Sequence, residues 1–132
     1  MRESTAEVQS RLVDFLPGFV ADLNKLAEVG WALLVEGQRD AKAVKDLGYL
    51  GPILTISALA RGRMRSLGSP AGIVILTDFD REGRQLAARY ARILNHEGIQ
   101  TTLSERKRLL IASSGIFRQI ENLSRFVEPA SV

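Results

Sequence analysis

Three carboxylates alternate with other residues along one short stretch of the chain, ILTDFDREGR, which runs from Ile75 to Arg84. Asp78, Asp80 and Glu82 are each two residues apart. In an extended chain such side chains point the same way, so their like charges repel unless a cation lies between them. Mg²⁺ prefers oxygen ligands and is typically held by one or two carboxylates, so this spacing indicates a site for Mg²⁺, or for Mn²⁺ in its place.

A second acidic position follows another apolar run. Glu36 comes directly after the apolar residues Trp31 to Val35, just as Asp78 follows an apolar run of its own. The carboxyl ends of parallel strands meet at one edge of a sheet, where the active crevice of such folds lies. If the two runs form neighbouring strands, Glu36, Asp78 and Asp80 share one pocket.

The same acids also have a purely structural interpretation. Asp78 or Asp80 would cap the helix that is expected to begin near residue 81. Glu82 would then be an ordinary acidic residue of the first helical turn. This interpretation suits any one of these residues taken alone. The whole set, with Glu36 at a second strand end and arginines among the acids, favours the metal site.

Short apolar runs alternate with helical patterns, which predicts an α/β fold. The runs are uniformly apolar, whereas a sheet with one buried face would show alternating polar residues. We therefore expect a parallel sheet of about four strands between helices. The expected strands are residues 31–35, 52–57, 73–77 and 99–103. The expected helices are residues 4–29, interrupted at Pro17-Gly18, 40–47 with Asp40 as N-cap, 81–96, and two short helices within 105–127.

Length and composition indicate a single globular domain. The chain has 132 residues, of which 45% are hydrophobic and 25% charged, enough for one core. We divide it into a helical segment at 1–30, a central domain at 31–103 and a helical extension at 104–132 packed on the same domain. The lack of cysteine excludes disulfide frameworks, thiolate nucleophiles and zinc–cysteine sites. No apolar run is long enough to cross a membrane, so we expect a cytoplasmic protein without a membrane partner.

The acidic motifs resemble those of a known domain. Glu36-Gly37 after one strand and the stretch from Asp78 to Gly83 after another look like the Toprim domain of type IA and type II topoisomerases, bacterial primases and several small nucleases. The second stretch is similar to the Asp-x-Asp-x-Glu form of type IA topoisomerases and reverse gyrase. The resemblance covers about residues 31–103, and it implies a four-stranded parallel sheet between helices.

The resemblance also implies roles for individual residues. Glu36 takes the part of general acid or base, and the implied Mg²⁺ ligands are Asp78, Asp80 and Glu82. Supporting positions are Gly37, Asp40 and Gly83, the last of which would let the backbone approach closely. Arg81 and Arg84 would meet phosphate oxygens.

The chain departs from the topoisomerases in one respect that bears on its chemistry. They use a nucleophilic tyrosine in a separate domain, and no such domain fits in this length. Tyr49 lies beside a turn and Tyr90 within an amphipathic helix, where both are expected to pack. We therefore expect a small nuclease in which water attacks phosphorus, by analogy with the Toprim ribonuclease that matures 5S ribosomal RNA.

Basic residues indicate how a nucleic acid would be held. Of the 18 basic residues, 14 are arginine, the side chain that grips phosphate in a planar, two-pronged way. Arg61, Arg63 and Arg65 follow the second strand and would guide RNA or DNA toward the metal; the alternative is a solvated loop. Residues 106–108 would extend this track or form a charged helix face. Few aromatic residues lie nearby, which favours recognition of the phosphate backbone.

Two other functions compete with the nuclease. The first is a non-catalytic Toprim module that binds nucleic acid or a partner protein. The second is a phosphatase of the haloacid-dehalogenase kind, which also places Asp-x-Asp after a strand. In those enzymes the acidic pair usually follows the first strand, whereas here it follows the third, so this function is the less favoured. No pattern in the sequence selects an oligomeric state.

Overall fold

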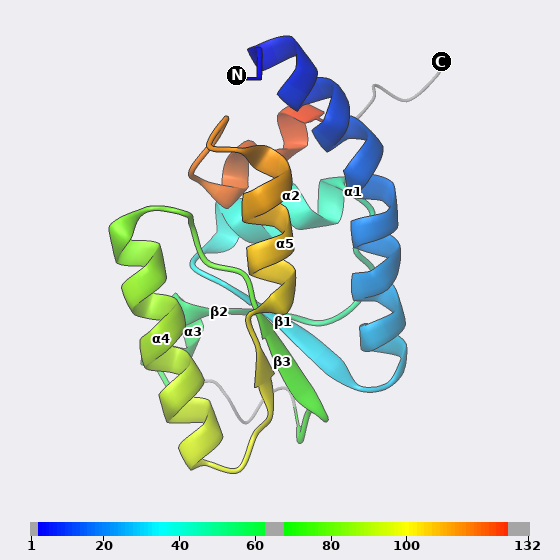
Figure 1. Ribbon diagram of the computed structural model, residues 1–132. Coiled ribbons are helices and arrows are strands. Elements are labelled where there is room, and N and C mark those ends of the chain that lie inside the picture. The colour runs from blue at the N-terminus through cyan, green and yellow to red at the C-terminus, as the bar shows by residue number, and fades with distance from the viewer. Residues whose placement is uncertain (1–2, 63–67, 127–132) are drawn as a thin grey trace.

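The computed structural model describes residues 3–62 and 68–126 (Figure 1). The elements in the first half are α1 (Thr5–Glu28), β1 (Trp31–Val35), α2 (Gln38–Asp46), β2 (Ile53–Thr55) and α3 (Ile56–Ala60). Those in the second half are β3 (Gly72–Ile75), α4 (Arg81–His96), β4 (Thr101–Thr102), α5 (Ser104–Ser113) and the 3-10 helix η2 (Ile120–Phe126).

The four strands form one parallel sheet in the order β2-β1-β3-β4. The predicted α/β fold with a four-stranded parallel sheet between helices is therefore confirmed. Strands β1 and β3 are the central pair, with Leu34 opposite Ile75 near their carboxyl ends. Residues that follow these two strands consequently leave the sheet side by side.

Side chains of the central strands alternate between two apolar layers. Leu33 and Val74 join α1, α2, α5 and η2 in the larger core cluster. Ala32 and Ile73 join the other cluster, to which α4 contributes its buried face. Helix α4 therefore covers one face of the sheet and α1 the other, as Figure 1 shows. Burial on both faces explains why the strands are apolar throughout.

Helix α1 runs unbroken through Pro17, so the predicted interruption there is wrong. Pro17 removes one hydrogen bond within the helix, but it lies on the exposed side. The apolar stripe on the opposite side continues past it from Leu16 to Phe19 and Val20, all buried in the core. Packing of this stripe holds the helix together across the proline. None of the helices in residues 3–62 and 68–126 is long and apolar enough to cross a bilayer.

Several element boundaries differ from the sequence-based prediction. Strand β2 ends at Thr55 rather than at residue 57, because Thr55 Oγ1 accepts the Ala58 N–H at 3.1 Å and caps the short helix α3. Strand β3 ends at Ile75 instead of Thr77. Strand β4 is limited to two residues at the sheet edge. The two predicted C-terminal helices are present as α5 and the 3-10 helix η2.

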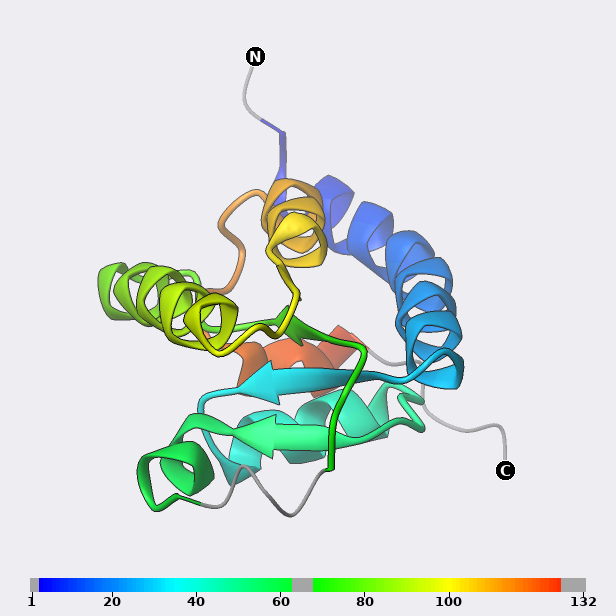
Figure 2. The same ribbon diagram turned by 90° about the horizontal axis from the view of Figure 1, so that it is seen from below.

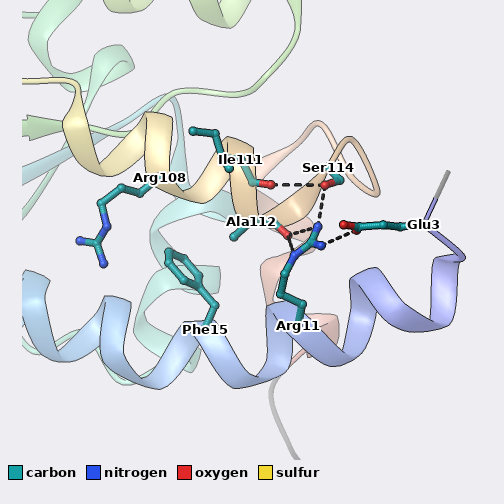
Figure 3. Close-up of a pocket in the computed structure, with 7 residues that line it drawn as sticks. All are labelled: Glu3, Arg11, Phe15, Arg108, Ile111, Ala112 and Ser114. Carbon is teal, nitrogen blue, oxygen red and sulfur yellow. Dashed lines mark hydrogen bonds and ion pairs between the residues drawn. The ribbon is translucent and has the colours of Figure 1, made fainter. Parts of the chain in front are cut away.

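The terminal segments are tied to each other as well as to the sheet. Arg11 of α1 donates from Nε and Nη2 to the Ala112 carbonyl at 3.3 and 3.2 Å, and from Nη2 to Ser114 Oγ at 2.6 Å (Figure 3). It also pairs with Glu3. A depression of about 470 Å³ lies beside these contacts, between α1 and α5. The N-terminal segment and the C-terminal extension therefore share one core with the central domain.

Two glycines provide a test of what stabilises the helices. A Cβ added at Gly18 or Gly98 meets no atom within 4 Å, but Gly98 has a φ of +83° whereas Gly18 lies within α1. Gly18→Ala is expected to raise the free energy of unfolding by about 0.5–1 kcal/mol, because alanine loses less backbone entropy in a helix. Gly98→Ala is expected to lower it by about 1–2 kcal/mol through left-handed strain. Urea unfolding measures both, and equal effects would contradict the assigned backbone.

Candidate functional site

Acidic residues meet where β1 and β3 end. The main-chain N–H of Asp78 donates to Glu36 Oε2 at 2.7 Å, a hydrogen bond that joins positions 42 residues apart in the sequence. Both side chains are half-buried. The parallel register of β1 and β3 brings their carboxyl ends to the same edge of the sheet. The predicted meeting of Glu36 with Asp78 is therefore confirmed. Asp80, predicted in the same pocket, lies near Asp78, where its charge adds to the burial that raises the pKa of Asp78.

Asp40 belongs to the same cluster, but in a role that differs from the predicted one. Helix α2 begins at Gln38, so Gly37 is the N-cap and Asp40 is the third helical residue. Its Oδ2 accepts the Gly37 N–H at 3.1 Å, which closes the turn after β1. Asp40 is buried. Asp40 is of a residue type that favours the N-cap position, but α2 begins before it, at Gln38.

The first turn of α4 packs against residues 76–80, the acidic loop between β3 and α4. Asp80 is the N-cap, and its Oδ1 accepts the Gly83 N–H at 2.7 Å. Thr77 Oγ1 donates to the Gly83 carbonyl at 2.6 Å. A Cβ at Gly83 would lie 2.0 Å from the Asp78 carbonyl oxygen. Glycine is needed here because the helix and the loop touch through their main chains, as the predicted close approach requires.

The C-terminal segment closes the loop from the other side. Asp78 Oδ1 accepts the Ile120 N–H at 2.8 Å, and the Phe79 N–H donates to the Arg118 carbonyl at 2.7 Å. Burial is the main cause that raises the pKa of Asp40 and Asp78, and the negative charge of Glu121 adds to it, while a main-chain hydrogen bond from Glu121 opposes it at Asp40. None of these C-terminal residues is predicted at the site from the sequence. Ile120 lies 42 residues after Asp78, and no local sequence pattern indicates a contact over that separation.

Arg106 is the functional residue that sequence reasoning misplaced. Predicted on a basic surface, it is buried beneath the acidic loop. Its Nε donates to the carbonyl and hydroxyl of Thr77 at 3.2 and 3.1 Å, its Nη2 donates to the Asp78 carbonyl at 2.5 Å, and its guanidinium stacks 5.4 Å from the Phe79 ring centre. A signal was present, since Arg106 shares a helical face with the buried Leu109 of α5.

The carboxyl groups perturb one another. Burial raises the pKa of Glu36 to about 7, and the negative charge of Asp78 adds to the effect. Burial likewise raises the pKa of Asp78 and of Asp40. The guanidinium of Arg106 is directed to main-chain carbonyls, and among the described residues it forms no salt bridge with these acids. The cluster therefore favours a cation or a proton.

The donor chemistry fits Mg²⁺. Main-chain N–H groups hold one oxygen each of Glu36, Asp78 and Asp80, and the Glu36 and Asp78 side chains also interact with each other. Carboxylate oxygens of this kind are the ligands that Mg²⁺ prefers. Within residues 3–62 and 68–126, no group of three or more acidic or histidine side chains is arranged as a ready-made metal site. Mg²⁺ is commonly held by one or two carboxylates together with water and substrate phosphate, so a complete protein cage is not required.

The remaining predicted residues lie around this cluster rather than within it. Glu82 is exposed on α4 and lines a surface depression with Gln85, Arg89 and Arg92. The structure shows no hydrogen bond from Glu82 to the other acids among the described residues.

The predicted arginines are dispersed. Arg81 and Arg84 are exposed in the first turn of α4, next to Asp80. Arg61 is exposed after α3. Arg63 and Arg65 lie outside the described residues.

The two tyrosines have packing roles. Tyr49 is buried, and its hydroxyl donates to the Pro52 carbonyl at 3.0 Å. Burial raises the pKa of Tyr49 to about 12, which makes the phenolate form scarce at neutral pH. Tyr90 packs half-buried against the α4 side of the core. Neither side chain is prepared to act as a nucleophile.

Comparison with known proteins relates the chain to one family. It is 34% identical over 102 residues to a UPF0292 protein of Thermococcus onnurineus, an alignment that covers 76% of this chain and 77% of that protein. The chain belongs to the UPF0292 family. A UPF0292 protein of Pyrococcus abyssi is 32% identical over 106 residues, which is 80% of each chain. One of Methanosarcina acetivorans is 26% identical over 123 residues, covering 92% of this chain and 85% of that protein.

A solved structure shares the fold of this UPF0292 chain. A protein from Aquifex aeolicus superposes with a TM-score of 0.65 at 20% sequence identity, covering 80% of this chain and 95% of that chain. Identity at this level carries the fold and not the function. No family model matches the chain.

The close approach at Gly83 can be tested by adding one methyl group. Gly83→Ala is expected to lower the free energy of unfolding by about 3 kcal/mol, because the new Cβ forces α4 away from the loop. Gly37→Ala is the control, since its Cβ meets no atom within 4 Å and the change is expected to stay below about 1 kcal/mol. Chemical denaturation measures both variants. A Gly83→Ala protein as stable as the wild type would disprove the contact.

The raised pKa of Glu36 predicts how stability changes with pH. In the folded protein this pKa is about 7, against 4.5 for an unperturbed glutamate, so the folded state binds the proton more tightly. Ionised Glu36 therefore destabilises the fold, with no effect below pH 4.5 and the full effect above pH 7. Glu36→Gln in EDTA is expected to add about 1 kcal/mol of stability above pH 7, after allowance for solvent screening, and nothing at acid pH.

Thermal unfolding across the pH range measures this difference. Glu28→Gln, at an exposed position near the end of α1, controls for the loss of one negative charge. If Glu36→Gln changes stability by the same amount at every pH, the pKa of Glu36 is not raised in the folded protein.

Proposed function

We propose that this chain is a small Toprim-type nuclease that cleaves phosphodiester bonds of RNA or DNA with Mg²⁺. The observation that carries the proposal is the contact between two neighbouring strand ends, where the Asp78 N–H donates to Glu36 Oε2. Carboxylates at the ends of adjacent parallel strands are what the Toprim resemblance implies. The sheet order β2-β1-β3-β4 supports it by making β1 and β3 neighbours.

Glu36 is suited to move a proton in this reaction. A group whose pKa is about 7 is present in both protonation states at neutral pH, the condition in which general acid–base catalysis is most effective. Water attacks the phosphorus, a new P–O bond forms, and the P–O bond to the leaving sugar oxygen breaks. Glu36 supplies the proton that the leaving oxygen takes up. The attacking water loses a proton to solvent, and Glu36 regains one from solvent. Water is the nucleophile because the phenol of Tyr49 is held by Pro52.

Asp78 and Asp80 are the proposed ligands of the metal. Their side chains are fixed by the Ile120 and Gly83 N–H groups, which hold them in place before substrate arrives. Mg²⁺ held by these carboxylates would polarise the phosphodiester and stabilise the charge that develops at the leaving oxygen. The exposed Arg81 is positioned beside Asp80 to hold a non-bridging phosphate oxygen.

A non-catalytic nucleic-acid-binding module is the second candidate. It is favoured by the structural work that each acid performs, since Asp80 caps α4, Asp40 closes the turn before α2, and Asp78 holds the C-terminal segment. In this case the acids would serve the fold alone. Any binding of nucleic acid would then be independent of metal and of the charge of Asp78.

Cleavage assays separate the two candidates. The purified chain is expected to cleave structured RNA or duplex DNA in Mg²⁺ or Mn²⁺ and to stop in EDTA. Glu36→Gln is expected to slow cleavage by about 10²–10⁴-fold through loss of proton transfer. Asp78→Asn is expected to raise the Mg²⁺ concentration required for half-maximal activity.

The surface variant Glu28→Gln serves as the matched control and is expected to retain full activity. Residual activity that survives Glu36→Gln unchanged would identify a contaminating nuclease and overturn the proposal. Tight binding without cleavage, unaffected by EDTA and by Asp78→Asn, would identify the non-catalytic module instead.

A further inference from the structure

The outer face of α4 carries a concentration of positive charge. Its four arginines, Arg81, Arg84, Arg89 and Arg92, are all exposed, and Glu82 is the single acidic residue of the helix. In the described part of the chain none of these arginines forms a salt bridge. The guanidinium groups are thus available to a ligand in solution.

This helix accounts for the net charge of the whole protein. The chain has 18 basic and 15 acidic residues, a net charge of +3. Helix α4 holds four of the basic residues and one of the acidic residues. The rest of the chain therefore has 14 basic and 14 acidic residues and is neutral overall. Helix α4 thus carries an excess of positive charge that attracts an anionic partner.

The position of α4 leaves this face open and connects it to the acidic cluster. Gly83, Ala87 and Leu94 face the core. Arg81, Arg89 and Arg92 therefore lie on the opposite side of the helix, and Arg84 lies on its flank. In both views α4 forms one margin of the molecule (Figures 1 and 2). The helix begins directly after Asp80 and extends about 24 Å from it. A polyanion lying along the helix would have one end at the acidic site.

The side chains on this face fit phosphate better than they fit bases. Arg89, Arg92 and Gln85 line a depression of about 360 Å³ together with Leu86 and one carboxylate, Glu82. The two arginines outnumber this acid, and arginine forks bind phosphate oxygens in pairs. None of the eight aromatic residues of the chain is exposed. Stacking on unpaired bases, on which binding of single strands depends, therefore has no platform here. Recognition must use the backbone, which a duplex displays most regularly.

We propose that the outer face of α4 binds the sugar-phosphate backbone of a nucleic acid duplex, with Arg89 and Arg92 holding phosphates at a distance from the acidic cluster. The inference rests on the proposed function for the kind of ligand, and it adds the surface and the double-stranded form. RNA and DNA duplexes share the backbone chemistry, and the experiment treats them as separate arms.

The test compares two double variants of equal charge change. Arg89→Gln/Arg92→Gln removes two arginines of α4, and Lys42→Gln/Lys45→Gln removes two exposed lysines of α2, a helix packed on the other face of the sheet. Binding to fluorescent RNA duplex, DNA duplex and single strands of equal length is measured by anisotropy over a range of salt concentrations. All measurements are made in EDTA, and circular dichroism checks that each variant is folded.

The arginine variant is expected to bind duplex about tenfold or more weakly, and its log Kd against log salt slope is expected to fall by about 1.8, or 0.9 for each lost phosphate contact. The lysine variant is expected to match the wild type.

The proposal is overturned if the arginine variant is unchanged, if both variants weaken equally, if single strands bind more tightly than duplexes, or if poly-glutamate competes as well as duplex. Because this experiment measures binding alone, an inactive protein leaves its result intact. Unchanged duplex binding by the arginine variant would overturn the α4 surface whatever the cleavage assay of the wild type shows.

Discussion

Two carboxyl groups lie together at one edge of the sheet, and the surrounding structure must offset their repulsion. Burial raises the pKa of Glu36 and of Asp78; the negative charge of Asp78 raises the pKa of Glu36 further, whereas a side-chain hydrogen bond with Glu36 opposes the rise at Asp78. The main chain provides the compensation, because N–H groups of Asp78, Ile120 and Gly83 point at the carboxylates of Glu36, Asp78 and Asp80. Such oriented dipoles form an anion-binding environment only when strand, loop and helix are all in place. The chemistry of the site is therefore inseparable from the fold.

The acidic loop is held in place by α5 and by the C-terminal segment, both of which are remote from it in sequence. Arg106 spans the Thr77 and Asp78 carbonyls and stacks on Phe79, while Phe79 packs against Phe117 at a centroid distance of 5.6 Å. The C-terminal segment is thus a structural part of the site and not an appendage. Holding several half-buried or buried carboxylates close together lowers stability, and such an arrangement is common at sites kept for binding or catalysis.

Helix α4 joins the two properties that matter for a nucleic-acid ligand. Its first turn is capped by Asp80 and fitted to the acidic loop through Gly83. Its outer face carries the arginines. A charge excess confined to one helix that begins at the acidic cluster would steer a polyanion along the helix and toward the site. The rigid attachment at Gly83 keeps the spacing between the arginines and the carboxylates constant.

Local patterns in the sequence determined the strands, the α/β class and the meeting of Glu36 with Asp78, because uniformly apolar runs mark buried parallel strands whose carboxyl ends coincide. They did not determine that α1 continues through Pro17 or that Arg106 is buried. Both outcomes depend on how much apolar surface a neighbouring segment covers, a quantity that no local pattern contains. The partner of each carboxylate was likewise decided by tertiary packing, since main-chain N–H groups are the same in every residue and only the folded chain selects which of them faces Asp78.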